Sequence, residues 1–290
     1  MAKHAASLGW GSFFWGIPAF LWQVIFFYIP LFFLIATSFI KHDSTSGGGL
    51  FTFDHYKALL NVVYIKIFLR SLLLACGTVI ACLLVAYPVA YYLALRVKKL
   101  KELWFALLVL PFWTNFLLLV YSWYFLLEND GLVNNLLLKL GIIAAPLQLI
   151  NTQFAVHCGM FYCYLPFMIL PLYSTFEKLD SRLLDASADL GATAFQTFTR
   201  ITLPLTMPGI ITGSLLVFIP SFGEFVVPAL LGGDKYLYIG SVITHYFLTV
   251  RDTAMGSAFT GVATLVLVTF LGSLFLIKQL FKSRKKNGKK

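Results

Sequence analysis

Charge is scarce in this sequence. Only 12% of the 290 residues are Asp, Glu, Lys or Arg, whereas 59% are hydrophobic, and the mean hydropathy is +0.84. Soluble domains carry charge on about a quarter of their residues. The composition therefore excludes a water-soluble globular protein, and we expect a chain that uses lipid as part of its solvent.

The signatures of familiar enzyme and metal sites are also missing. The sequence has no GxxxxGK[ST] phosphate loop, no GxSxG and no HExxH, so neither ATP binding by that loop nor a familiar hydrolase is indicated. Its five histidines show no metal-ligand spacing, and its four cysteines form no CxxC pair. We interpret the cysteines as free thiols and predict a chain that is not an enzyme and carries no cofactor or metal.

Long apolar runs take the place of these motifs. About 20 residues of helix cross a hydrocarbon core of roughly 30 Å, whereas barrel strands would alternate over about 10 residues. The first run is too long for a signal-peptide core, and no small-x-small cleavage pattern follows it. We predict an all-α membrane protein with a single transmembrane domain over 1–290 and six spans: 13–40, 68–95, 103–127, 154–176, 207–231 and 258–280.

The placement of basic residues predicts the orientation. The net charge is +10, and most of the 22 Lys and Arg residues lie in Arg96–Lys101, in the loop 177–206 and from Lys278 onward. By the positive-inside rule these segments and both termini are cytoplasmic. We interpret the basic tail 281–290 as an orientation signal with affinity for anionic membrane lipid, and not as a nucleic-acid site.

Two of the loops predicted on the extracytoplasmic side have informative sequences. The first, 41–67, contains STSGGG, which is typical of a flexible segment. The other, 128–153, opens with the turn signal NDG and continues with LVNNLLLKLGII. That stretch has helical apolar spacing but is too short to span, so we expect an amphipathic helix at the outer membrane surface.

The loop 177–206 is polar and begins like a helix. Asp180 or Ser181 is placed to cap the helix start, and Asp185 near the first turn suits the helix dipole. Pro204 ends the segment. Three- and four-residue steps build one apolar face from Leu183, Leu184, Leu190, Ala194, Phe195 and Phe198.

Gly191 is expected in the middle of this helix, where it costs about 1 kcal/mol relative to Ala. Such a cost indicates that another backbone or protein surface comes close. From spacing alone, that surface is either a separate protein or the inner ends of the chain's own spans.

The segment resembles the EAA loop of permease subunits of bacterial ATP-binding-cassette importers. The pattern of that family is E-A-A-x-x-x-G, nine residues, then I-x-L-P. This sequence has Asp185-Ala186-Ser187, then Gly191, then Ile201-Thr202-Leu203-Pro204 at the same spacing. Asp185 replaces Glu and Ser187 replaces Ala, and each keeps the charge or the small size.

The resemblance implies a type I (MetI-like) importer permease of the bacterial inner membrane, with a cytoplasmic coupling helix. The coupling helix would dock on a separate, homodimeric ATP-binding subunit, which holds magnesium-ATP. Other implied partners are a second homologous permease subunit and an extracytoplasmic binding protein. In this sequence the coupling residues would be Asp185, Ala186, Gly191, Phe195, Phe198, Ile201, Leu203 and Pro204.

Three further stretches resemble the spermidine/putrescine permeases, one branch of that family. They are LPFWTN at 110–115, LPLYSTFEKLD at 170–180 and SFGEFVVPALLGG at 221–233. The resemblance implies half of a translocation path for polyamines, with a polyamine-binding protein outside. Import of another small solute stays an alternative. A stand-alone secondary transporter is a third reading, although we find no obvious internal repeat.

Glu224 is the one acidic residue well inside an apolar run. A carboxylate there costs about 2.5 kcal/mol or more unless it is paired or wet, so it should face the interior. Its neighbours Pro220, Gly223 and Pro228 predict a broken helix that lines a cavity. Glu224 pairs with a substrate ammonium group, or it forms a structural pair with a basic residue of the second permease, or it is a protonated, hydrogen-bonded acid.

Aromatic faces attract ammonium groups by about 0.5–2 kcal/mol each. On this ground we predict that Trp113, Tyr121 and Phe222 line the substrate path together with Glu224. Asn115 joins them because a buried amide needs hydrogen-bond partners.

Overall fold

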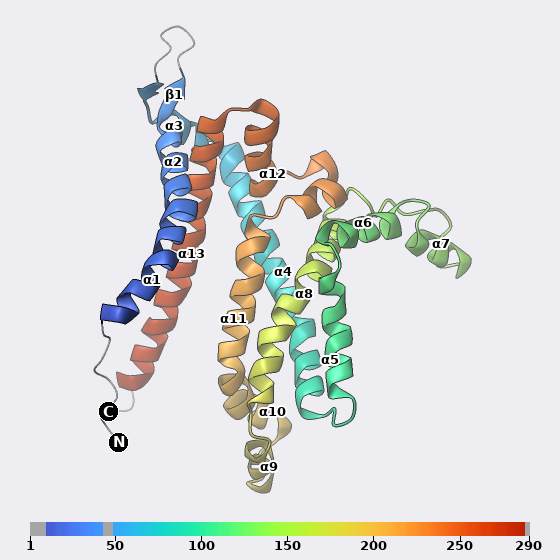
Figure 1. Cartoon of the computed structure of the whole chain (residues 1–290). Coiled ribbons are helices and arrows are strands. Elements are labelled where there is room, and N and C mark those ends of the chain that lie inside the picture. The colour runs from blue at the N-terminus through green and yellow to red at the C-terminus, as the bar shows by residue number, and fades with distance from the viewer. Residues whose placement is uncertain (1–9, 43–48, 288–290) are drawn as a thin grey trace. The chain divides into compact units, whose positions relative to one another are not determined.

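The computed structural model describes residues 10–42 and 49–287 of the chain. The described chain is almost wholly helical (Figure 1), as predicted. Within these ranges, six helical segments are long and apolar enough to cross a membrane: Ile17–Ser38, Val62–Leu95, Phe116–Lys139, Gln153–Glu177, Ala194–Phe222 and Thr253–Ser273.

The chain divides into two compact units, one made of residues up to 64 and from 243 onward, and one of residues 65–242. In the first unit, α2 and α3 pack against the long helix α13. Hydrogen bonds Ser38 Oγ–Tyr56 Oη and Tyr64 Oη–Tyr246 Oη, both 2.7 Å, tie its segments together. Its elements are α1 Trp10–Gln23, η1 Val24–Tyr28, α2 Ile29–Ser38, β1 Ile40–His42, β2 Gly49–Phe51, α3 Asp54–Leu59, η6 His245–Val250 and α13 Thr253–Asn287.

A short hairpin lies in the loop predicted over 41–67. β1 and β2 pair antiparallel, with Ile40 opposite Phe51, and the Phe39 and Phe51 rings stack with their centroids 5.3 Å apart. Most of the STSGGG stretch lies outside the described residues. The hairpin was not predicted, because three-residue strands leave almost no alternation in a sequence.

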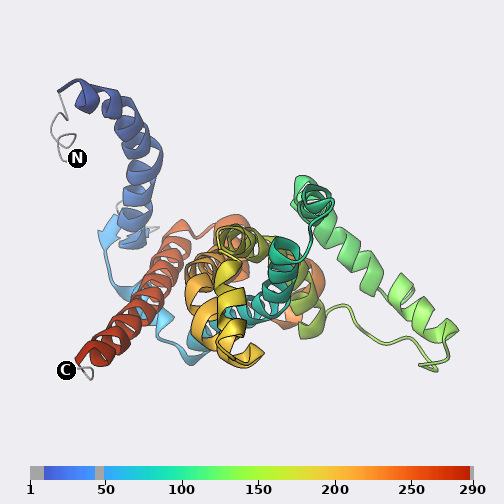
Figure 2. The ribbon, with the colours of Figure 1, turned by 90° about the horizontal axis from the view of Figure 1, so that it is seen from below.

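The second unit is a bundle around α8 and α11, which run side by side (Figures 1 and 2). Gly209 and Gly213 let the two backbones approach, since a Cβ at Gly209 would lie 2.4 Å from Thr175 Oγ1. The elements are α4 Val62–Leu95, α5 Lys101–Val109, η2 Leu110–Trp113, α6 Phe116–Leu127, α7 Leu132–Lys139, α8 Gln153–Glu177, α9 Arg182–Asp189, α10 Ala194–Thr197, η3 Phe198–Thr202, α11 Leu203–Phe222, η4 Pro228–Gly232, η5 Gly233–Lys235 and α12 Ile239–Thr244.

The run 103–127 is divided into two helices. α5 ends in the short 3₁₀ helix η2, and α6 then leaves at a large angle to α5 (Figures 1 and 2). Asn115 starts α6 as its N-cap, because its side chain accepts a hydrogen bond from the Leu117 N–H at 2.8 Å. Pro111 in η2 lacks the N–H that a continuous α-helix would need.

The amphipathic helix predicted after NDG is present as α7, and its buried residue is polar. Asn134 is fully buried, whereas Leu132 and Leu136 are 57% and 50% exposed. The Asn134 amide hydrogen-bonds to Glu128 O and to both backbone groups of Leu147. Exposed leucines around a polar anchor suit a helix that lies against lipid.

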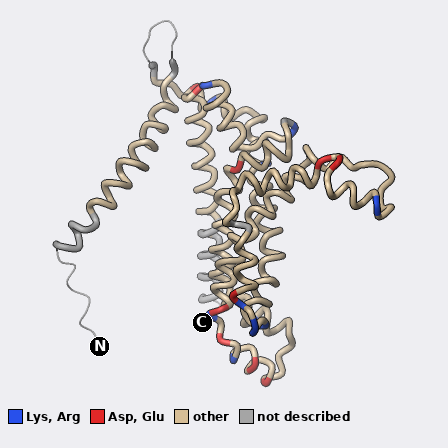
Figure 3. The backbone as a smooth tube through the Cα atoms, turned by 45° about the vertical axis from the view of Figure 1, so that its right-hand side comes forward, with Lys and Arg blue, Asp and Glu red and all other residues tan. Residues whose placement is uncertain are grey.

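Charged residues of the described helices lie mostly toward the helix ends (Figure 3). The basic tail predicted over 281–290 is helical as far as Asn287, because α13 continues to that residue. Lys and Arg are good helix formers, which explains the continuation. All four cysteines are free, as predicted, and Cys82 and Cys163 are buried.

Candidate substrate groove and coupling surface

The predicted helix break is present at Glu224. α11 ends at Phe222, and helical structure resumes at Val226. Glu224 Oε1 accepts hydrogen bonds from the Phe225 and Val226 N–H groups at 3.0 and 2.8 Å. Glu224 Oε2 accepts one from the Tyr164 hydroxyl at 2.5 Å. The carboxylate therefore caps the new helical turn and is anchored to α8.

Glu224 lies at the edge of a groove of about 550 Å³ between α8 and α11, which α6 reaches with its first residue. The groove combines one carboxylate with aromatic and aliphatic walls. Its lining residues are Phe116, Tyr164, Phe167, Leu215, Leu216, Ile219, Pro220 and Glu224. Such a surface suits a flexible molecule with apolar methylene segments and a positive charge.

The other predicted path residues lie outside this groove. Trp113 is 87% exposed and Tyr121 is 43% exposed. Phe222 is buried and stacks on Phe218, with ring centroids 6.3 Å apart. The side-chain oxygen of Asn115 accepts the hydrogen bond that caps α6. The groove instead uses Phe116, directly after Asn115, and Tyr164, which lies 60 residues before Glu224 in the sequence.

The loop 177–206, called the coupling loop below after the role that the resemblance implies, contains two short helices, α9 and α10. Asp180 Oδ1, not the Ser181 side chain, accepts the hydrogen bond from the Arg182 N–H at the start of α9. Thr193 and Gln196 form a capping box that starts α10. The Ser187 and Thr197 hydroxyls, 2.9 Å apart, join the two helices.

Gly191 is not in the middle of a helix, contrary to the prediction. It lies in the turn after α9 with φ +75°, a conformation that is costly for residues with a Cβ. No described atom lies within 4 Å of a Cβ built on Gly191. Its backbone geometry, and not a close neighbour in this chain, accounts for the glycine.

Large apolar side chains are exposed on the coupling loop. Leu190 and Phe195 are 88% and 75% exposed, and Phe198 is 39% exposed. Asp185 and Ala186 are exposed on α9. Ile201 and Leu203 are half-buried where η3 meets α11, and Pro204 follows in the first turn of α11. Neighbouring exposed apolar side chains are typical of a docking surface.

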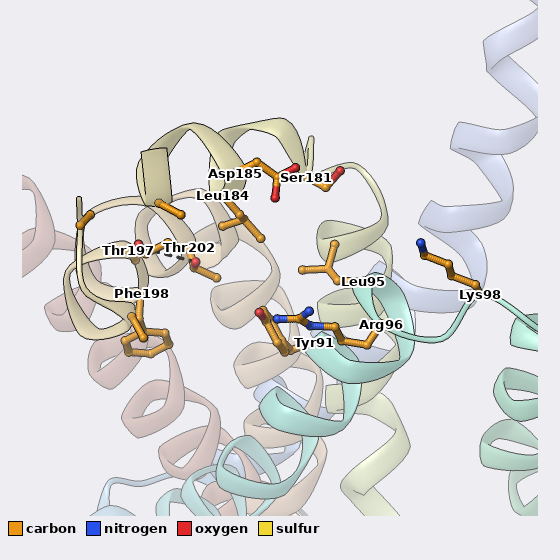
Figure 4. Close-up of a pocket in the computed structure, with 13 residues that line it drawn as sticks. Tyr91, Leu95, Arg96, Lys98, Ser181, Leu184, Asp185, Thr197, Phe198 and Thr202 are labelled. Atoms are coloured by element: carbon orange, nitrogen blue, oxygen red, sulfur yellow. Dashed lines mark hydrogen bonds between the residues drawn. The ribbon is translucent and has the colours of Figure 1, made fainter. Parts of the chain in front are cut away.

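A cavity of about 680 Å³ separates the coupling loop from the end of α4 (Figure 4). Asp185 and Arg96 line it from opposite walls, and the Arg96 side chain lies beside Tyr91. At the start of α5, Lys101 Nζ lies 3.2 Å from Glu177 Oε1. Burial lowers the pKa of Lys101, but hydrogen bonds with Glu177 and Tyr173 outweigh it and leave that pKa raised. This pair ties α5 to the end of α8.

These features define a helical membrane protein with a groove beside a helix break and a loop that exposes apolar side chains. Residues 86–286 match the family described as "Binding-protein-dependent transport system inner membrane component". The chain belongs to this family. It is a permease subunit of an importer of the ATP-binding-cassette class and a multi-pass protein of the inner membrane.

Individual proteins with similar sequences or folds place the chain more narrowly within this family. The chain is 45% identical over 247 residues to the spermidine/putrescine transport system permease protein PotB of Escherichia coli (strain K12). This match covers 85% of this chain and 90% of that protein. A bacterial transporter that imports the acidic polysaccharide alginate contains a chain of the same fold. Its TM-score is 0.75 at 18% identity, with 93% of this chain and 96% of that chain covered. The alginate transporter in complex with a periplasmic protein gives a TM-score of 0.72 at 18% identity, with 90% and 91% covered.

Proposed function

We propose that this chain forms half of the translocation path of an ATP-driven polyamine importer. The observation that carries the proposal is the groove that holds Glu224 among Phe116, Tyr164 and Phe167. A polyamine carries ammonium groups on methylene links, so the carboxylate and the aromatic faces bind the former and the aliphatic wall covers the latter. The 45% identity to a spermidine/putrescine permease supports the same cargo.

The remaining parts of the importer are separate chains. The second half of the path is a homologous permease subunit, and an extracytoplasmic polyamine-binding protein delivers the cargo. A homodimeric ATPase subunit binds magnesium-ATP, and it docks on the loop that carries Leu190, Phe195 and Phe198. Both termini and this loop lie on the cytoplasmic side, in keeping with the bias of basic residues.

Docking explains how ATP binding moves the path. A ligand shifts a conformational balance only through different affinities for the two states. Closure of the ATPase dimer displaces the coupling loop, and η3 passes the displacement into α11, which begins directly at Leu203. The far end of α11 carries the break at Glu224. One helix thus joins the docking surface to the groove.

The test is uptake of labelled spermidine into proteoliposomes that contain this chain with its co-purified partners, with and without ATP on the cytoplasmic face. ATP-dependent uptake is expected. ATP turnover without entry of spermidine or putrescine would keep the importer and refute the cargo. No response to ATP, with the ATPase subunit present, would refute the coupling role of the loop.

A substitution addresses the groove itself. Glu224→Gln keeps the shape and removes the charge, and a charge-assisted hydrogen bond contributes about 1.5–3 kcal/mol. Uptake at limiting spermidine should fall roughly tenfold or more. Asp130→Asn removes an exposed carboxylate away from the groove and serves as the control. Unchanged uptake in Glu224→Gln would assign Glu224 a structural role only.

A further inference from the structure

The helix break after α11 leaves one side of α8 uncovered. Up to the break, α11 packs along that side, where Thr175 and Met168 of α8 lie against glycines of α11. The last contact in this row is the hydrogen bond between Tyr164 and Glu224. Beyond Glu224 the chain no longer follows this side of α8.

The chain after the break packs on a different side of α8. A Cβ at Gly159 would meet the Leu231 side chain, and a Cβ at Gly232 would meet Val156, so η4 lies against the first turns of α8. With about 3.6 residues per turn, Gly159 points about 140° away from Tyr164 around the helix axis. The row of α8 that contacts α11 therefore continues past the break without η4 over it.

His157 occupies this uncovered part of the row. Seven residues make almost two helical turns, so His157 lies on the same side of α8 as Tyr164 and about 10 Å further along the axis. His157 is exposed although it lies within the span Gln153–Glu177. An ionisable side chain at such a position is typical of a substrate pathway. Phe161, half-buried, lies between His157 and Tyr164.

The imidazole of His157 is held with one ring nitrogen available. Nδ1 lies 2.7 Å from Gln153 O. A carbonyl oxygen only accepts hydrogen bonds, so Nδ1 carries the proton, and Nε2 of the neutral ring is an acceptor. Within residues 10–42 and 49–287, no group donates a hydrogen bond to Nε2. Gly77 of α4 lies beside Nε2, since a Cβ there would be 3.7 Å away.

The separation of the two acceptors matches one length of polyamine. Bonds of about 1.5 Å advance an extended chain by roughly 1.25 Å each. The terminal nitrogens of spermidine are nine bonds apart, or about 11 Å, and those of putrescine five bonds apart, or about 6 Å. An extended spermidine therefore spans the roughly 10 Å between the levels of His157 and Tyr164, and putrescine does not.

We propose that His157 is a specificity-determining residue that favours a triamine over a diamine. Its Nε2 accepts a hydrogen bond from one terminal ammonium group while Glu224 binds the other, and Phe161 contacts the methylene groups between them. A diamine bound at Glu224 does not reach His157. The inference rests on the proposed polyamine cargo and names the member of that class which the path prefers.

Uptake of labelled spermidine and labelled putrescine by the assembled importer in proteoliposomes tests this role. His157→Leu removes the acceptor and keeps a side chain of moderate size. Spermidine uptake at limiting concentration should fall roughly tenfold, whereas putrescine uptake should stay within about twofold of the wild type. The binding protein is the same in every sample, so its own selectivity cancels when each variant is compared with the wild type.

Two matched variants separate contact with cargo from packing. His157→Gln places an amide oxygen near the position of Nε2 and should retain most of the preference for spermidine. Tyr162→Phe removes a hydroxyl group from the opposite side of α8, about 160° from Tyr164, and should leave both uptake rates unchanged. Melting temperatures in detergent verify that each variant is folded.

The outcomes distinguish this inference from the proposed function. An equal fall for both amines in His157→Leu would assign His157 to packing, and unchanged spermidine uptake would remove it from the path. Either result overturns the inference and leaves the proposed function in place, provided that Glu224→Gln lowers uptake of both amines. If the wild type imports neither amine with ATP present, the proposed function fails and the inference fails with it.

Discussion

Asn134 should decide whether the segment after α6 keeps its fold. Its side chain is fully buried and makes three hydrogen bonds: from Nδ2 to Glu128 O at 3.2 Å, from Nδ2 to Leu147 O at 2.9 Å, and from Leu147 N to Oδ1 at 2.9 Å. It thereby joins the end of α6, helix α7 and the returning chain. Asn134→Ala removes all three bonds at once.

The magnitude follows from these contacts. A hydrogen bond contributes about 0.5–1.5 kcal/mol net, so the three together contribute about 3 kcal/mol. Leu147 is 44% exposed, so water can replace part of the hydrogen bonding that its backbone groups lose. Asn134→Ala should therefore lower the stability of the segment by about 2–3 kcal/mol. The loss is local, because the segment can open without the α8–α11 pair. Opening should become roughly 30- to 150-fold more frequent.

Hydrogen–deuterium exchange measures this directly on peptides that span residues 128–150. Asn135→Ala is the matched control, since Asn135 is exposed and makes one bond to Asp130 O at 2.8 Å. Exchange in the control should change by less than about fivefold. Equal protection in Asn134→Ala and wild type would refute the anchoring role, and so would equal losses in the two variants.

Three further changes test the packing and the coupling loop. Gly209→Ala should destabilise the chain by about 1–3 kcal/mol, because its Cβ would meet Thr175 at 2.4 Å. Gly272→Ala is the control and should not destabilise the chain, because no described atom surrounds that position. The melting temperatures of the two variants in detergent test this difference. Gly191→Ala should destabilise the turn after α9 by about 1–2 kcal/mol, because φ is +75° there, and Gly191→Asn should destabilise it less. Transport-coupled ATP turnover should therefore fall in the Ala variant only. Leu190→Ser/Phe195→Ser should leave the melting temperature of the isolated chain unchanged but lower its affinity for the ATPase subunit at least tenfold, and unchanged affinity would remove this surface from the interface.

The spans and the break at Glu224 were predictable because their causes are local. A run of apolar residues sets a span, and Gly223 follows directly after the last residue of α11, although Pro220 lies inside α11 and Pro228 lies beyond the break. The apolar face of the coupling loop was predicted on one continuous helix, whereas the structure places Leu190 in the turn after α9 and Phe195 on α10. Gly191 was misplaced because a glycine that starts a turn and a glycine inside a helix differ only in φ, which periodicity does not report.

The residues that line the groove could not be predicted from the sequence, because only the fold brings them together. Tyr164 reaches Glu224 across 60 residues, and no spacing rule links them. Asn115 was predicted to face the path because a buried amide needs partners, but the backbone of its own helix supplies one. Phe222 is adjacent to the break, yet the end of α11 turns it into the interior beside Phe218. Side-chain direction at a helix end depends on the last turn, which composition does not specify.

The hydrogen bonds of Glu224 fit a site from which cargo must leave. Its two oxygens already accept three bonds, so an incoming ammonium finds a carboxylate that is oriented but partly satisfied. A path through a membrane needs binding strong enough for entry and weak enough for release. The position of the carboxylate is also tied to the fold around it, since a Cβ at Gly240 would lie 2.3 Å from Gly223 O and 2.8 Å from Glu224 O. α12 therefore packs directly on the backbone of the break. Under the proposed function, the break is a position where a conformational change of the bundle would alter the affinity for a cation.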